Sequence, residues 1–333
     1  MRAAAGLLAS ACAAAIATPL HAQDTTGEEP AIDNPTIVVT AQRRAESLQA
    51  VPIAVSAFDA EALEAQQIEN AADLQLTLPN VSFTKSNFTS ASFTIRGIGD
   101  LCVGVSCDSA TAIHTNGSPL FGTRLFETEY FDLERIEVLR GPQGTLYGRN
   151  SNGGAIKIVT KKPSATPEFS VSGTLGNYDR WETRFSGNGA ITDRFFVRGN
   201  ALVQQANGYG RNLTLNKAVN DTDYHGARVA FRALPSDSVT VDLALDYSRD
   251  RTNGIYASDV SNRNRPRTTS LYYSLAGIDN SGDAKTYGAS LHVSWDINDS
   301  TSFTSITGWR KTDQDLVLEL SDQPVCRLGV QRS

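Results

Sequence analysis

One stretch decides the fold: Glu134-Arg135-Ile136-Glu137-Val138-Leu139-Arg140-Gly141-Pro142-Gln143-Gly144-Thr145-Leu146-Tyr147-Gly148-Arg149, followed by Asn150-Ser151-Asn152-Gly153-Gly154-Ala155-Ile156-Lys157-Ile158-Val159-Thr160. Ile136 and Val138 alternate with Arg135 and Glu137, and the same alternation of apolar and polar residues returns around Lys157. Such alternation predicts two strands, each with one apolar face. The glycines and the proline between the runs predict tight turns. The sequence therefore predicts a strand, a reversal and a second strand.

Composition limits the class of protein. The chain has 333 residues and a net charge of −6, with 40% hydrophobic and 20% charged residues. This composition supports a sizeable core and differs from that of a disordered chain. Basic residues are scattered, which disfavours nucleic acid as a partner. After the first twenty residues no apolar run is long enough for a membrane-spanning helix, so a membrane location would require a β-barrel.

Residues 1–22 are typical of a secretory signal peptide. A positive charge precedes an apolar segment from Ala3 to Ala17, and Leu20-His21-Ala22 resembles a cleavage site. A lipoprotein cleavage box ending at Cys12 is the alternative, but Ala9 stands where leucine is usual. We therefore expect an exported protein.

A polar, acidic segment follows over residues 23–45, and its composition predicts flexibility. It contains the β-branched run Thr36-Ile37-Val38-Val39-Thr40-Ala41. Such a run is either an ordinary edge strand or a segment that binds a partner by strand addition, in which main-chain hydrogen bonds supply the affinity. The residues alone leave both interpretations open.

Residues 46–163 carry the signals of a small α+β domain. Asp59 is a good N-cap for a first helix. Asn70 caps a second helix, which has Asp73 at its N3 position and ends at Pro79. The expected order is strand, helix, helix and two strands, at Val51–Phe58, Ala60–Gln67, between Asn70 and Pro79, at Val81–Phe83 and at Phe93–Gly99.

From Glu168 onward the sequence consists of alternating runs, such as Val239–Tyr247 and Tyr287–Trp295. A soluble sandwich shows such alternation too. A membrane barrel is favoured by run lengths of about 9–11 residues, by aromatic residues at run ends, and by tight turns that alternate with long polar loops. The expected tight turns are Ile191–Asp193, Leu234–Asp237 and Asn298–Ser300, and the expected long loops are Ala206–Thr222 and Arg249–Asp283. We expect about seven antiparallel strands between Glu168 and Leu318.

The quoted stretch, the phrase Phe93–Gly99 and the hexapeptide Thr36–Ala41 resemble the TonB-dependent outer-membrane receptors, in which a plug domain fills a barrel of about 22 strands. The resemblance implies a signal peptide over residues 1–22, a periplasmic segment over 23–45, a plug over 46–163 and a partial barrel over 168–333. It also implies that the hexapeptide is a TonB box, which the energy-transducing protein TonB binds through Thr36, Ile37, Val38, Val39, Thr40 and Ala41.

Seven strands cannot close around a plug of this size. We therefore expect the chain to be a fragment or a truncated product. An in-frame continuation beyond Ser333 through further strands would restore a receptor, whereas a stop codon would leave a relic.

The resemblance also implies a plug latch. In the family, plug arginines pair with barrel glutamates and help to hold the plug inside the barrel. The matching residues here are Arg96 and Arg140; solvated strand-end arginines are the alternative.

Cys102 and Cys107 lie five residues apart in an exported protein, which favours a local disulfide. A metal site would need further ligands, and His114 is the only nearby histidine.

The segment Asp100–Phe126, which we call the apical segment, departs from the family: many members carry an aspartate at the position of Asn116. This substitution puts the ligand contacts in doubt and leaves the fold intact. His114, two residues earlier, is either a ligand contact or an ordinary strand residue, and the second interpretation is favoured.

The function implied is active import of a scarce, large nutrient across the outer membrane, most commonly a ferric siderophore. The implied partners are TonB, outer-membrane lipid and the ligand, with no cofactor and no resident metal. The alternatives are a non-functional fragment and a passive channel or adhesin that needs no TonB box. Gly141, Gly144 and Gly148 lack the ending of a phosphate-binding loop, and no catalytic constellation is present, so an enzyme is not expected.

Overall fold

The computed structural model describes residues 38–40, 46–49, 51–86, 90–99, 108–122, 125–126, 129–252, 273–274, 276–318 and 329–332. Several predictions lie outside these residues: the signal peptide, most of the segment 23–45, Thr36, Ile37 and Ala41 of the hexapeptide, and the cysteines Cys102 and Cys107.

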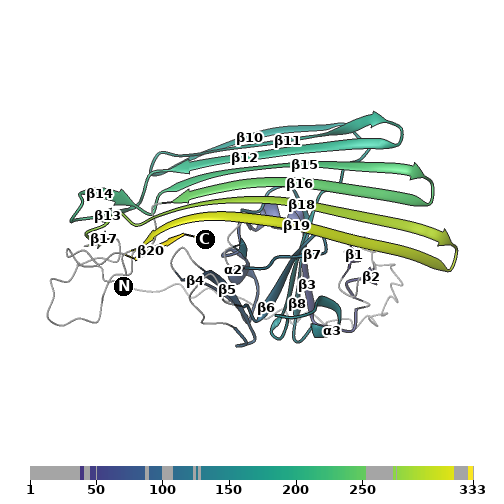
Figure 1. Ribbon diagram of the computed structural model, residues 1–333, viewed down its shortest axis with the longest axis horizontal. Helices are drawn as coiled ribbons and strands as arrows, with labels where there is room; N and C mark the ends of the chain where they lie inside the picture. Colours follow the sequence, from purple (N-terminus) through teal and green to yellow (C-terminus); the bar gives the residue numbers. More distant parts are fainter. Residues whose placement is uncertain are drawn as a thin grey trace, which may run out of the picture. The chain divides into compact units, whose positions relative to one another are not determined.

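The first sheet contains the quoted stretch and has the strand order β3-β8-β9-β6-β7. Its strands are β3 (Val55–Asp59), β6 (Thr111–Thr115), β7 (Ser118–Pro119), β8 (Leu133–Arg140) and β9 (Gly154–Thr160) (Figure 1). β8 and β9 pair antiparallel, whereas β6 and β9 pair parallel. The predicted strand, reversal and strand are thus confirmed.

The reversal between β8 and β9 contains one element that the sequence did not predict, the short helix α3 (Gly144–Tyr147). Gly141 and Gly148 flank it with φ angles of 106° and 78°, a backbone region that side chains other than glycine's disfavour. These two glycines therefore serve the turns that reverse the chain.

Two helices precede this reversal. Asp59 caps α1 (Ala60–Ala65) as predicted, with its Oδ1 accepting the Ala62 N–H at 2.8 Å. The second helix is shorter than predicted: α2 covers only Leu74–Thr77. Asp73 Oδ2 accepts the N–H groups of Glu69 and Asn70 at 2.9 and 3.0 Å, so the predicted capping residues hold a turn ahead of the helix.

The remaining short strands form small sheets of their own. β4 (Val81–Ser86) and β5 (Ser90–Ile95) make a hairpin, and β1 (Val38–Val39) pairs antiparallel with β2 (Glu46–Ser47). β13 (Gly210–Asn212), β14 (Lys217–Val219) and β17 (Tyr273–Ser274) form a three-stranded sheet within the two predicted long loops.

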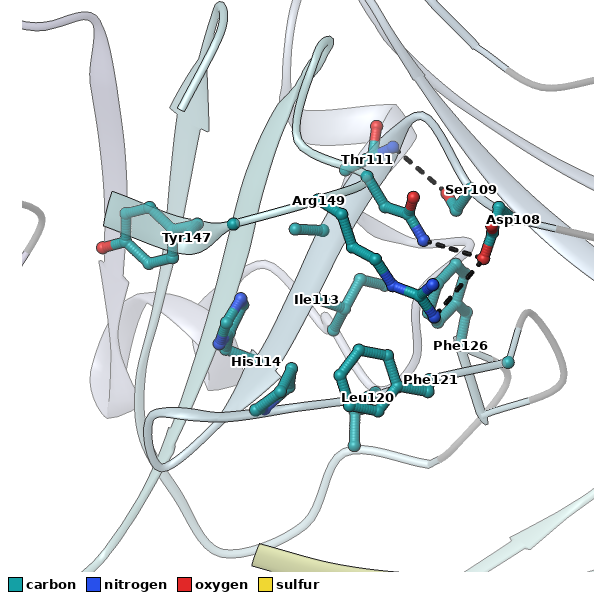
Figure 2. A pocket seen from close by; sticks show the side chains of 15 residues that line it. Asp108, Ser109, Thr111, Ile113, His114, Leu120, Phe121, Phe126, Tyr147 and Arg149 are labelled. Atoms are coloured by element: carbon teal, nitrogen blue, oxygen red, sulfur yellow. Dashed lines mark hydrogen bonds and ion pairs between the residues drawn. The ribbon is translucent and has the colours of Figure 1, made fainter. Parts of the chain in front are cut away.

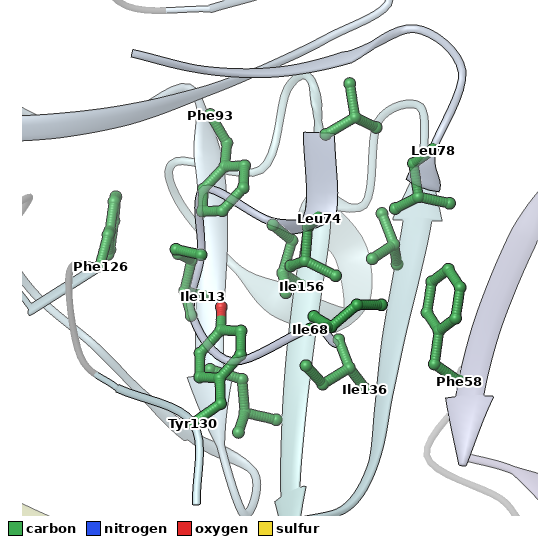
Figure 3. Close-up of a cluster of buried hydrophobic side chains, with 14 of the residues drawn as sticks. Phe58, Ile68, Leu74, Leu78, Phe93, Ile113, Phe126, Tyr130, Ile136 and Ile156 are labelled. Carbon is green, nitrogen blue, oxygen red and sulfur yellow. The ribbon is translucent and has the colours of Figure 1, made fainter. Parts of the chain in front are cut away.

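Both faces of the first sheet are buried. The larger cluster gathers Ile136, Ile156 and Ile113 from the strands with Leu74 of α2 (Figure 3). Burial of an isoleucine of this kind contributes about 2–5 kcal/mol, as judged from truncation to alanine. A smaller cluster on the opposite face contains Leu139. The prediction of one apolar face per strand was therefore incomplete, because the second face is covered as well.

The second sheet holds the C-terminal strands, in the order β10-β11-β12-β15-β16-β18-β19-β20, with every neighbouring pair antiparallel (Figure 1). They are β10 (Glu168–Gly176), β11 (Arg180–Thr192), β12 (Phe195–Ala206), β15 (Thr222–Ser236), β16 (Val239–Thr252), β18 (Ser281–Asn298), β19 (Thr301–Leu318) and β20 (Gly329–Arg332). Seven of them lie between Glu168 and Leu318, as predicted.

Six of the seven strands between Glu168 and Leu318 run longer than the expected 9–11 residues, and β18 and β19 have 18 residues each, whereas β10 has 9. The three predicted tight turns mark the reversals from β11 to β12, from β15 to β16 and from β18 to β19, although the first strand of each pair extends into the predicted turn. Polar residues beyond the apolar runs also pair in the ladders, for example Asp283 with Asp315. The alternating runs therefore marked the strands but not their ends.

The two faces of this sheet differ in chemistry. One carries exposed apolar and aromatic residues, among them Leu245, Trp295 and Trp309, while the other buries polar side chains such as Arg198 and Asn200. An apolar outer face and a polar inner face are typical of membrane barrel strands. In the part of the chain that the structure describes, no helix is both long and apolar enough to cross a membrane.

Candidate functional site

The described part of the predicted TonB box is docked as a strand. Val38 pairs with Ser47 and Val39 with Glu46 in the short ladder between β1 and β2. The Val39 side chain is fully buried and belongs to the same apolar cluster as Leu139. Of the six residues, the structure thus places Val38, Val39 and Thr40.

Thr40 lies on a group of charged side chains that we call the Thr40 clamp, defined as Arg135, Glu137 and Lys157. Glu137 Oε1 accepts the Thr40 N–H at 3.0 Å and the Thr40 hydroxyl at 3.1 Å. Lys157 Nζ donates to the Thr40 carbonyl oxygen at 2.6 Å and also contacts the hydroxyl. Arg135 reaches the same hydroxyl at 3.3 Å. Side chains from β8 and β9 therefore bind both main-chain groups of Thr40.

The clamp residues also bind one another. Glu137 faces Lys157 across β8 and β9, with Nζ and Oε2 3.0 Å apart, and Arg135 Nε donates to Glu137 at 2.8 Å. The Glu137 side chain is fully buried. Burial alone would raise the pKa of Glu137, but Lys157, the Thr40 N–H and Arg135 together lower that pKa below its ordinary value. Glu137 is therefore a buried carboxylate at neutral pH.

The two predicted latch arginines have different surroundings. Arg140 is half-buried and donates to Ser56 Oγ of β3 at 3.1 Å. Arg96 is exposed, has a left-handed backbone with φ 53°, and lies beside Gly141. Among the described residues, neither arginine has a carboxylate at ion-pair distance. Their pairing with glutamates further along a barrel stays a prediction.

A different arginine joins the first sheet's domain to the second sheet. Arg198 of β12 forms a fork with Asp132, through Nε at 2.8 Å and Nη2 at 2.6 Å, and its Nη1 binds Glu168 at 2.9 Å. The Arg198 and Asp132 side chains are only 4% and 6% exposed. No local pattern predicts this pair, because 66 residues separate its members.

A second contact between the first sheet's domain and the second sheet surrounds Glu69. Its carboxylate lies 3.4 Å from Arg180 and 3.3 Å from Arg184 of β11. Glu129 faces the same region, where burial, with Asp250 as the next largest cause, raises the pKa of Glu129 to about 8. Glu129 is thus largely protonated at neutral pH.

The residues of the apical segment have structural contacts. Asn116 is in the left-handed region with φ 50°, its Nδ2 donates to Thr160 Oγ1 at 3.0 Å, and its Oδ1 accepts the Thr160 N–H at 3.0 Å. Asn116 and Gly117 form the turn between β6 and β7, an Asn-Gly pair typical of tight hairpins. His114 is 3% exposed, and its ring meets the edge of Tyr147 at 5.2 Å. The favoured interpretation of His114 as a strand residue agrees with this packing.

A pocket of about 170 Å³ opens beside His114 (Figure 2). Arg149 lies over the Phe121 ring at 5.2 Å and 3.7 Å from Asp108. Asp108 also accepts from Asn150 at 3.1 Å. The pocket thus combines an aromatic floor with one guanidinium that already has a carboxylate partner.

Comparison with known proteins gives the family. Residues 47–155 match the family model described as TonB-dependent Receptor Plug Domain. The pesticin receptor of Yersinia pestis is 28% identical over 212 residues, which are 62% of this chain and 31% of that protein. The iron-regulated outer membrane virulence protein of Vibrio cholerae is 29% identical over 234 residues, which are 68% of this chain and 34% of that protein. The chain spans about a third of the length of these relatives.

Solved structures agree on the fold. The ferric yersiniabactin uptake receptor FyuA from Yersinia pestis aligns with a TM-score of 0.70 at 22% identity, covering 80% of this chain and 42% of that one. The pyoverdine outer membrane receptor FpvA from Pseudomonas aeruginosa aligns with a TM-score of 0.69 at 14% identity, covering 88% and 43%. The predicted fold class, a plug followed by antiparallel barrel strands, is confirmed. Residues 47–155 therefore match a TonB-dependent receptor plug domain, and the chain is similar over most of its length to receptors of the outer membrane.

Proposed function

We propose that this chain serves TonB-dependent active import of a ferric siderophore across the outer membrane. The observation that carries the proposal is the segment Val38–Thr40, which is held on a plug domain by the pairing of β1 with β2 and by hydrogen bonds to Thr40. In this mechanism, ligand binding on the outer side shifts the plug and frees the hexapeptide. TonB then adds a strand to Thr36–Ala41 and pulls, using the proton gradient of the inner membrane.

The choice of cargo rests on relatives. Similar structures are described as receptors for ferric yersiniabactin, ferric catecholate and pyoverdine, and a curated relative is described as iron-regulated. A ferric siderophore is therefore the substrate class that we propose first. Uptake should be compared across ferric siderophores, haem, cobalamin and oligosaccharides.

The coupling to TonB is tested by removing one main-chain donor. Val38→Pro deletes the N–H at the centre of the hexapeptide, whereas Val38→Ala keeps it and serves as the matched control. In cells expressing the gene that encodes this chain, uptake of a radiolabelled ferric siderophore should be lost in Val38→Pro and retained in Val38→Ala. A protonophore should abolish uptake in the unmodified chain and in Val38→Ala. Unchanged uptake in Val38→Pro would instead indicate a passive channel.

A further inference from the structure

Thr40 has both of its main-chain hydrogen-bonding groups occupied by side chains of the plug. Its N–H donates to Glu137 at 3.0 Å, and its carbonyl oxygen accepts from Lys157 at 2.6 Å. In a β-ladder these groups would be bound by the carbonyl and the N–H of a neighbouring strand. A carboxylate and an ammonium group here perform the two roles that a partner strand would perform.

Thr40 also lies just beyond the internal ladder. β1 pairs with β2 through Val38 and Val39 only, so β2 does not bind Thr40. A partner strand that adds along the edge of the hexapeptide on which the Thr40 N–H and carbonyl group lie would bind those two groups. Those two groups become available only when Glu137 and Lys157 release them.

The release leaves no isolated charge in the plug. Glu137 and Lys157 are 3.0 Å apart, and Arg135 donates to the same carboxylate at 2.8 Å. Breaking a buried ion pair is costly mainly because it leaves one charge without a partner. When Thr40 departs, the clamp residues remain paired with one another, so the contact can open and close without disrupting the sheet.

From these contacts we infer that Glu137 and Lys157 act as a substitute partner strand, which competes with TonB for the backbone of Thr40. The inference rests on the proposed function, because it takes Thr36–Ala41 as the segment that TonB binds. The clamp would hold the hexapeptide in a binding-incompetent state, and plug movement would favour TonB by weakening the clamp.

The test measures the Kd of the periplasmic domain of TonB for the whole chain folded in detergent micelles. The Glu137→Gln/Lys157→Met double variant removes both charges together, which avoids leaving one of them buried alone. Glu64→Gln on the exposed surface of α1 is the matched control for a lost carboxylate. The double variant should bind about 10- to 100-fold more tightly than the unmodified chain, and the control should bind as the unmodified chain does.

A second variant covers the case in which the double variant does not fold. Thr40→Val removes the hydroxyl that all three clamp residues contact, while it leaves the plug intact and keeps the main chain. TonB should bind Thr40→Val about 3- to 10-fold more tightly. Amide hydrogen exchange at residue 40 should be faster in both variants, since the N–H loses a strong acceptor or its supporting contacts.

Two results separate this inference from the proposed function. Equal Kd values for the unmodified chain and both clamp variants would overturn the competition while leaving TonB binding in place. If Val38→Pro bound TonB as tightly as the unmodified chain, or if no variant bound TonB, the proposed function would be refuted. The proposed competition between the clamp and TonB would then be refuted as well.

Discussion

The buried fork between Arg198 and Asp132 should be a major attachment of the plug to the second sheet. Arg198 donates to Asp132 through Nε at 2.8 Å and Nη2 at 2.6 Å, and both side chains are less than a tenth exposed. Arg198→Met should cost about 3–5 kcal/mol, because it leaves the Asp132 carboxylate buried without its partner. The bond to Glu168, which is 51% exposed, adds little.

A double-mutant cycle isolates the coupling free energy between Arg198 and Asp132. Arg198→Met, Asp132→Asn and the double variant are compared by urea unfolding in detergent micelles, followed by circular dichroism. The coupling free energy should be about 2–3 kcal/mol. The matched control is the pair Arg194–Asp237, which has a similar distance of 2.7 Å but is 54% and 95% exposed; its coupling should be below about 1 kcal/mol. A coupling in the buried pair no larger than in the exposed pair would refute the role of the fork.

Three further predictions concern single groups. Because the pKa of Glu137 is lowered, docking of the hexapeptide should be fully stable above pH 4.5, the ordinary value, and should weaken as pH falls further; hydrogen exchange at Thr40 measured against pH checks this. Because the pKa of Glu129 is raised to about 8, the free energy of unfolding should decline from pH 4.5 to 8, and Glu129→Gln should remove this decline. A side chain at position 308 would clash with Oγ and Cβ of Ser118, so Gly308→Val should destabilise the chain by about 1–3 kcal/mol. Gly199→Val, where the added carbon would have open space, is its control, and equal losses in urea unfolding would contradict the predicted clash.

Local chemistry made much of the fold predictable. The alternation around Ile136 gave the two strands, Asp59 gave the start of α1, and the alternating runs gave the seven long strands. These signals work because each depends on residues that are close together in the sequence. The short helix α3 was missed because glycines at both of its ends read as turn residues.

The candidate site was less predictable, because its contacts join distant segments. Alternation showed that Glu137 and Lys157 share a face, but not that Thr40, 97 residues before Glu137, covers that face. A lysine and a glutamate on strands expected to pair were the available signal. Nothing local indicated that Asp132 would meet Arg198. Predictions for Arg96 and Arg140 depended on the family resemblance, and the described carboxylates do not pair with them.

The most direct test of the central claim is whether TonB contacts the hexapeptide. A cysteine introduced by Val38→Cys should form a disulfide with a cysteine-bearing TonB in energised cells, and addition of the ferric siderophore should increase the yield. The unsubstituted chain controls for the native cysteines, and Glu64→Cys on α1 controls for a plug surface that TonB does not bind. We predict crosslinking at residue 38 alone. Equal yields at residues 38 and 64, or a yield at 38 no higher than in the unsubstituted chain, would contradict the assignment of Thr36–Ala41 as the TonB-binding strand.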